Sequence, residues 1–147
     1  MNDRVIATPA PLWLRLLAGI YDLLPLLGLW FLAGVLALAL TGGMLDPHRL
    51  AHKLIVQGLV LGFSTAYFVT SWSRGGQTLG MRAWRLRAVS CDGGAIHWPR
   101  ALLRFGVALI SLGTLGIGFV WALFDVERRT WHDLATRTLV VRVEKPR

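Results

Sequence analysis

Residues 12–40 read LWLRLLAGIYDLLPLLGLWFLAGVLALAL, and this stretch decides the fold of the chain. Its only charged residues are Arg15 and Asp22. An α-helix rises about 1.5 Å per residue, so roughly 20 apolar residues cross the hydrocarbon core of a bilayer. A soluble core helix has no need of such length without a polar face. The stretch therefore predicts a transmembrane helix that is retained and not cleaved as a signal.

The two charges of this helix lie on one predicted face. Arg15 and Asp22 are close to two helical turns apart, so both side chains should point the same way. Arg15 lies near the start of the helix, where a long side chain can reach the headgroups. Asp22 lies deeper and is too short to do so. An ionisable group at that depth is costly, so it should face protein or water and mark a partner or a pathway.

Composition supports a small polytopic membrane protein. The chain has 147 residues, which is one domain (1–147) by length, and 54% of them are of hydrophobic types. A net charge of +8 suits nucleic-acid binding, but in a membrane protein basic residues set topology and contact anionic headgroups. We therefore expect the lipid bilayer and its anionic headgroups as partners, and no nucleic acid. The single cysteine, Cys91, excludes an internal disulfide and a Cys-rich metal site.

A second apolar run, residues 54–73, predicts a second full span. Gly58 and Gly62 have the spacing that lets two helix backbones approach closely, so we expect a homo-oligomer or a partner membrane subunit. Before the first span, residues 1–11 predict a flexible lead-in. After the second, residues 74–100 are rich in arginine, and MRAWRLRAV followed by CDGGAIHW predicts a small β-ribbon. By the positive-inside rule this ribbon and both termini are cytoplasmic.

A third apolar run, residues 101–124, allows two interpretations. One straight span satisfies its length but places the basic tail, residues 125–147, outside the cell. A helical hairpin bent at the glycines returns the tail to the cytoplasmic side, where TLVVRV could pair with the ribbon. We favour the hairpin. The predicted fold is an all-α membrane protein, a small helical bundle of two full spans plus this third segment, with a short cytoplasmic β-ribbon.

Catalytic and metal-binding motifs are weak in this sequence. His48 and His52 have helical i, i+4 spacing, but no third ligand accompanies them, so no metal is expected. No nucleophile elbow or metalloprotease motif is present, and the stretch GGQTLG lacks the lysine of a phosphate-binding loop. We expect no enzymatic activity and no cofactor.

Three local patterns resemble the RDD family of small integral membrane proteins. They are RLLAGIYD at 15–22, GQTLGMR at 76–82 followed by LRAV, and WHDLA at 131–135 followed by TLVV. The resemblance covers nearly the whole chain. It implies that the arginine of the family name is Arg15 and that the two aspartates are Asp22 and Asp133. It also implies a bacterial plasma (inner) membrane and a role in transport, with cation–proton antiport suggested for some members.

Two functional hypotheses follow. In the first, Asp22 binds a monovalent cation or a proton, and oxygen atoms of nearby polar side chains complete the site. The supporting polar residues in this hypothesis are Gln57, Ser64, Thr65 and His132. In the alternative, the protein is a non-transporting adaptor or assembly module. Arg15 then reaches Asp133, and together with Asp22 they form a structural charge network.

Overall fold

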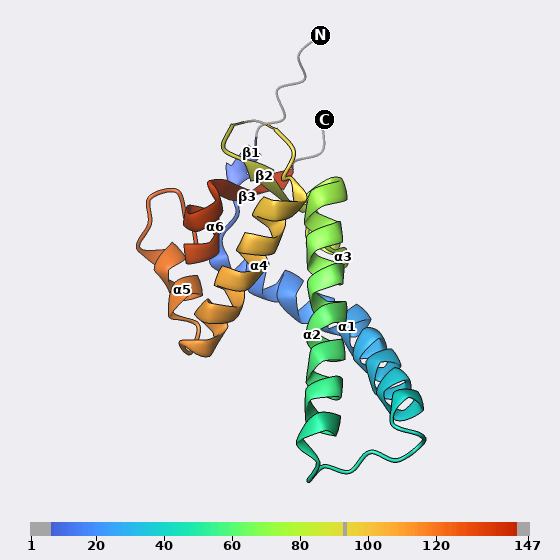
Figure 1. Ribbon diagram of the computed structural model, residues 1–147. Helices are drawn as coiled ribbons and strands as arrows, with labels where there is room; N and C mark the ends of the chain where they lie inside the picture. The colour runs from blue at the N-terminus through green and yellow to red at the C-terminus, as the bar shows by residue number, and fades with distance from the viewer. Residues whose placement is uncertain (1–6, 93, 144–147) are drawn as a thin grey trace. The chain divides into compact units, whose positions relative to one another are not determined.

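The computed structural model describes residues 7–92 and 94–143 (Figure 1). The described residues form two compact units. One contains residues 7–22 and 68–143, and the other contains residues 23–67. The first unit carries the sheet, the short helices and the charged residues Arg15, Asp22 and Asp133.

Both predicted spans are present as long helices. Helix α1 is Leu12–Leu40, with the predicted bounds, and α2 is Leu50–Gly75. Both are long and apolar enough to cross a membrane. Helix α1 ends where Gly42 and Gly43 adopt positive φ, a conformation that glycine reaches without steric cost. Within the unit of residues 23–67, the indole Nε1 of Trp30 donates to Ser64 Oγ at 2.9 Å and links the two helices.

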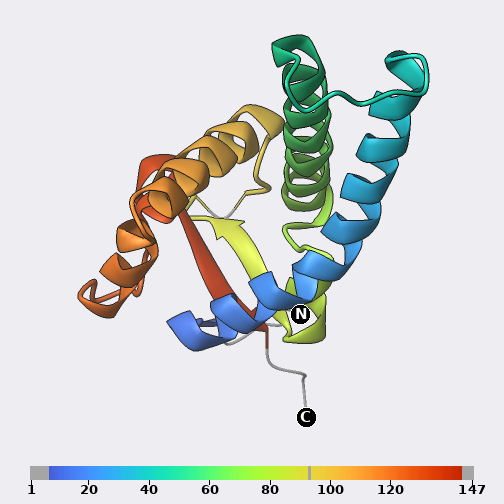
Figure 2. The ribbon, with the colours of Figure 1, turned by 90° about the horizontal axis from the view of Figure 1, so that it is seen from below.

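The predicted β-ribbon is a three-stranded antiparallel sheet in the structure. Its strands are β1 (Ala7–Pro9), β2 (Leu86–Ser90) and β3 (Thr138–Val143), in the order β1-β3-β2. The predicted pairing of TLVVRV with the arginine-rich segment is confirmed, because Ala88 lies opposite Val140. Figure 2 shows the yellow strand β2 beside the red strand β3.

Two predictions about this region are wrong. No local hairpin forms over 74–100: β2 pairs with β3, and the described residues between β2 and Trp98 form turns and irregular backbone. A short helix, α3 (Leu79–Ala83), precedes β2 instead of a strand.

The predicted flexible lead-in contains strand β1, in which Pro9 is tolerated because an edge strand can dispense with one donor. Residues 1–6 of that lead-in lie outside the described part of the chain.

The third apolar run is broken as the glycines predicted. Helix α4 (Trp98–Gly113) is followed by α5 (Ile117–Val120) and a 3₁₀ turn, η1 (Trp121–Leu123). The axes before and after the break differ by 109°. The break contains Leu115 and Gly116, both with positive φ. A single straight helix over 101–124 is therefore not formed.

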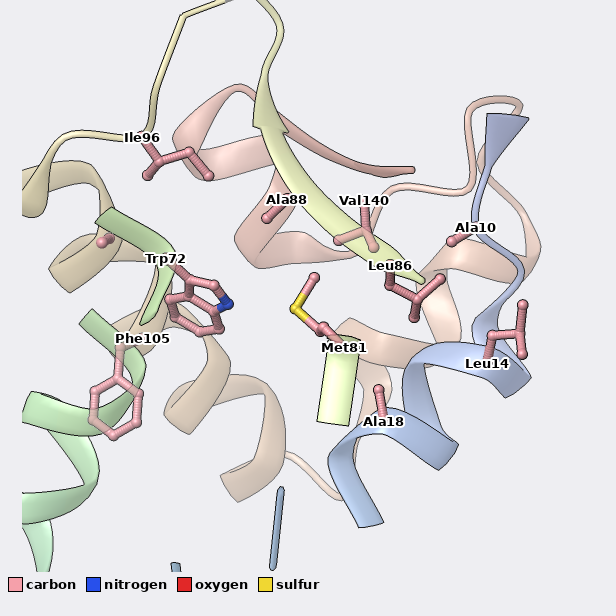
Figure 3. Packing of buried hydrophobic residues seen from close by; sticks show 11 residues of the cluster. Ala10, Leu14, Ala18, Trp72, Met81, Leu86, Ala88, Ile96, Phe105 and Val140 are labelled. Carbon is pink, nitrogen blue, oxygen red and sulfur yellow. The ribbon is translucent and has the colours of Figure 1, made fainter. Parts of the chain in front are cut away.

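The last helix, α6 (Trp131–Thr136), leads directly into β3. The apolar core of the first unit lies between the sheet, the start of α1, the end of α2 and the start of α4 (Figure 3). Phe68 and Trp72 from α2 stack near Phe105 from α4, with ring centroids 5.2 to 5.6 Å apart. The buried side chains of this core are those of Ala10, Leu14, Ala18, Trp72, Met81, Leu86, Ala88, Ile96, Ala101, Phe105 and Val140.

Candidate functional site

The site is built on one face of the first helical turns of α1. Arg15, Ala18 and Asp22 follow one another at helical spacing and turn toward the interior of the first unit, where Ala18 and Asp22 are buried. The predicted common direction of Arg15 and Asp22 therefore agrees with the structure. The two side chains nevertheless contact different elements, and each contact is described in turn.

Asp133 is the centre of the first contact. It is fully buried near the start of α6, and its Oδ2 lies 2.6 Å from Nη1 of Arg15. Its Oδ1 lies 2.5 Å from Nη1 of Arg104. Oδ2 also accepts the backbone N–H of Thr130 at 3.1 Å, and the two residues form a capping box that starts the helix. One carboxylate thus orders α6 and binds two arginines.

Arg15 connects this carboxylate to the sheet. Its Nε donates to the carbonyl of Ala10 at 3.1 Å, and its Nη2 donates to the carbonyl of Val140 at 3.4 Å. A guanidinium presents five donors in a rigid plane, so one side chain can serve several acceptors at once. Arg15 therefore fastens the start of α1 to strand β3 and to α6 together.

Arg104 is the functional residue that the sequence reasoning missed. It is almost fully buried in α4, donates to the hydroxyl of Thr138, and lies 5.1 Å above the Trp72 ring. The signal for it was a lone arginine one turn inside an apolar run, away from the headgroups. Such a charge needs a buried counter-charge. Within the described residues its Nε has no hydrogen-bond partner.

The charges of this cluster do not cancel. Burial and the neighbouring positive charge of Arg104 lower the pKa of His132 to about 3, so its imidazole is neutral at physiological pH. Burial opposes ionisation of Asp133, but the guanidiniums of Arg104 and Arg15 and the backbone N–H of Thr130 favour the carboxylate, and its pKa lies well below the ordinary range. The cluster therefore holds two guanidiniums against one carboxylate. His132 contributes a contact at 2.9 Å between its Nε2 and Thr130 Oγ1.

Asp22 makes the second contact, with the start of α3. Its Oδ2 accepts the hydroxyl of Thr78 at 2.6 Å, and its Oδ1 accepts the backbone N–H of Gly80 at 2.8 Å. Thr78 is the N-cap of α3, and its hydroxyl oxygen accepts the N–H of Met81. Asp22 thus secures the first turn of α3 to α1.

Ala18 and Gly80 explain why the two helices can approach so closely. A Cβ at Gly80 would lie 1.9 Å from the carbonyl oxygen of Ala18 and 3.0 Å from Cγ of Asp22. Only glycine leaves room for this approach. In the first pattern, Arg15 contacts α6 and β3, whereas Ala18 and Asp22 both lie against α3. Thr78 and Gly80 come from the second pattern.

The supporting polar residues divide between the two units. His132 lies beside Asp133, whereas Gln57, Ser64 and Thr65 belong to the unit of residues 23–67. Ser64 and Thr65 donate to carbonyls of their own helix, at 2.8 and 2.7 Å. Gln57 is exposed. Among residues 7–92 and 94–143, no group of three His, Cys, Asp or Glu side chains is arranged to hold a metal ion.

Comparison with known proteins gives one family. The sequence model described as the RDD family matches residues 9–137, which is most of the chain. The matched range includes Arg15, Asp22 and Asp133. No curated protein and no solved structure matches the chain.

Proposed function

The chain belongs to the RDD family, and on this premise we propose that it is an integral membrane assembly module whose arginine and two aspartates are structural anchors. One observation carries the proposal: both aspartates face hydrogen-bond donors of the protein itself. Asp133 binds Arg15 and Arg104, and Asp22 binds the hydroxyl of Thr78 and the N–H of Gly80.

This chemistry suits anchoring better than cation binding. A hard cation is held by oxygen lone pairs that converge on it. At Asp22 both carboxylate oxygens already accept hydrogen atoms, and the Thr78 oxygen accepts a further N–H from Met81. A cation bound there would displace the cap of α3. Loss of a helix cap costs about 1 kcal/mol.

An assembly module needs a surface for its partner, and the unit of residues 23–67 offers one. No atom lies within 4 Å of the position that a Cβ would occupy at Gly58 or Gly62. These glycines are therefore available for close packing against another membrane helix. The partner is a second copy of the chain or another membrane subunit. The proposed location is a bacterial plasma membrane, with the basic sheet region and both termini in the cytoplasm and in contact with anionic headgroups.

The second candidate function is cation–proton exchange at Asp22. It is favoured by one observation, that Asp22 is a carboxylate only 3% exposed on a helix long enough to span the membrane. Buried acids in such helices mark ion and proton pathways in other membrane proteins. In this candidate, a proton or a monovalent cation takes the place of the hydrogen bonds from Thr78 and Gly80 during the transport cycle.

Asp22→Asn distinguishes the two functions. Asparagine offers only one acceptor oxygen, so one donor of α3 loses its acceptor at a cost of roughly 1–3 kcal/mol. The assembly module predicts a lower melting temperature in detergent, and no flux of Na⁺, K⁺ or H⁺ in liposomes even for the wild type. Exchange predicts wild-type flux that the variant loses. Asp92→Asn, at an exposed carboxylate paired with Arg100, is the matched control and should change neither property.

A further inference from the structure

Helix α4 buries polar residues and exposes apolar ones, the reverse of a helix on the surface of a soluble protein. Its buried residues include Arg104 and Ser111, whereas its exposed face is apolar. The structure describes all of residues 101–124, and none of their exposed side chains is charged. The large exposed apolar side chains of this segment are those of Leu102, Leu103, Leu109, Ile110, Leu112, Leu115, Ile117, Val120, Trp121, Leu123 and Phe124.

The two ends of this apolar surface carry the residues of a membrane interface. Trp98 is 65% exposed and Arg100 is exposed at the start of α4. At the other end, Trp121 is followed by Arg128 and Arg129. Tryptophan and arginine favour the headgroup region, where a ring or a guanidinium can keep one side apolar and the other hydrated. Both ends therefore carry residues that suit a headgroup region.

The sheet requires an even number of membrane crossings between one of its strands and the next. Strands β1 and β2 both hydrogen-bond to β3, so all three lie on one side of the membrane. Helices α1 and α2 separate β1 from β2, and two crossings return the chain to the same side. Between β2 and β3 the chain passes through α4, α5 and η1, and it must likewise cross an even number of times. A single span at this position is incompatible with the sheet.

The bend allows the segment to enter the membrane and return to the side of the sheet. In Figure 1, α4 descends from the sheet, and after the 109° break the chain turns back through α5 toward α6. Gly118 packs directly on α4, because a Cβ there would lie 2.1 Å from Ser111 Oγ. The return arm, α5 with η1, is about 10 Å long at 1.5 Å per residue. Helix α4, with 16 residues, is about 24 Å long, and a bilayer core is about 30 Å thick, so neither arm crosses it.

We propose that residues 98–124 form a re-entrant hairpin inserted into the membrane from the cytoplasmic side, with acyl chains covering its apolar surface. The tip is Leu115, which is 96% exposed. Arg104 and Ser111 are buried against α6 and α5. The exposed polar side chain within residues 101–124 is that of Thr114, whose hydroxyl donates to the carbonyls of Ile110 and Ser111. Insertion of the hairpin does not depend on whether Asp22 carries ions or only anchors α3.

Cysteine labelling of the full chain in cells tests the crossing number. Native Cys91 is exposed and precedes α4, so it reports one end of the hairpin. Val126→Cys, in a Cys91→Ser background, reports the other end at a side chain that is 99% exposed. Met44→Cys, in the connection between α1 and α2, is the control for the outer side. With a membrane-impermeant maleimide, we expect Met44→Cys to react in intact cells, and Cys91 and Val126→Cys only after permeabilisation. Reaction of Val126→Cys in intact cells overturns the hairpin.

A depth measurement tests what covers the tip. Leu115→Cys in the same background is labelled with an environment-sensitive fluorophore and reconstituted in phosphatidylglycerol-containing liposomes. Spin-labelled lipids should quench the fluorophore, whereas iodide in the aqueous phase should not. Quenching by iodide alone means that the tip lies outside the bilayer and overturns the proposal. Oxidative cross-linking of Leu115→Cys into dimers, without quenching by spin-labelled lipid, assigns the surface to a second copy and also overturns it.

Discussion

Asp133 and Arg15 are 118 positions apart in the sequence, yet Oδ2 of the aspartate lies 2.6 Å from Nη1 of the arginine. The carboxylate is fully buried and the arginine side chain is only 9% exposed. A buried pair of this kind adds little free energy compared with a well-packed apolar contact, because both charges lose their hydration. Removing one partner, however, leaves the other charge buried without a counter-charge.

Asp133→Asn is expected to destabilise the fold severely. It leaves the guanidiniums of Arg15 and Arg104 buried without a counter-charge, and breaking a buried pair costs roughly 3–5 kcal/mol. Thermal unfolding in detergent measures the loss. Asp92→Asn removes an exposed partner of Arg100 and should cost at most about 1 kcal/mol. Equal melting temperatures for the two variants would contradict the anchoring role.

Gly80→Ala should separate α3 from α1. The added methyl group would stand 1.9 Å from the carbonyl oxygen of Ala18, which belongs to a helix backbone and cannot rotate away. Overpacking of this kind costs about 1–3 kcal/mol. Gly106→Ala is the matched control, since its helical position has no atom within 4 Å of a Cβ and alanine there should stabilise by about 1 kcal/mol. The melting temperature in detergent should fall for Gly80→Ala and rise for Gly106→Ala. A change in the same direction for both variants would count against the close approach of α3 to α1.

Stability should fall as the pH drops below the ordinary pKa of histidine, because of His132. Burial first, and then the positive charge of Arg104, lower its folded-state pKa to about 3, while the unfolded chain titrates near 6.5. Between these values the unfolded state binds more protons, so stability is lost as the pH falls, by up to about 1.4 kcal/mol per unit. The lowered pKa of Asp133 adds a further loss only below about pH 4.

His132→Gln removes this titration while retaining a side chain that can bond to Thr130. Melting temperatures are measured from about pH 6.5 down to about pH 4.5, above the range in which Asp133 contributes. They should decline more steeply for the wild type than for the variant. Parallel declines would show that His132 is protonated without penalty, and hence that it is less buried than the structure has it.

The apolar helices could be predicted from sequence, whereas the contacts of the charges could be predicted only in part. Helix α1 has its predicted bounds, since an apolar run ending at Gly42 and Gly43 specifies a helix by local chemistry alone. The contact between Arg15 and Asp133 was expected as a structural network, and it is present. Its completion by Arg104 was not, because an arginine within an apolar run carries no local sign of its partner.

The remaining errors share a cause. The turn signal at Asp92 indicated a local hairpin, but the described residues after it provide no partner strand for β2. The pairing of β2 with β3, about fifty positions away, was expected only from the bend of the third apolar run, because no local pattern encodes a pairing at that distance. The contact of Asp22 with Thr78 and Gly80 likewise depends on how α3 packs on α1. Periodicity reports which face of an element is buried, and it does not report which distant segment covers that face.

The central position of β3 has a consequence for biosynthesis. Strands β1 and β2 both bond to β3 and occupy its two sides, and β3 is the last strand of the chain. During translation the first two strands leave the ribosome with no sheet partner, and they remain unpaired until the final strand is made. A nascent chain interrupted before Thr138 would expose two strand edges, which invite aggregation or proteolysis. Completion of the sheet therefore waits for the synthesis of residues 138–143.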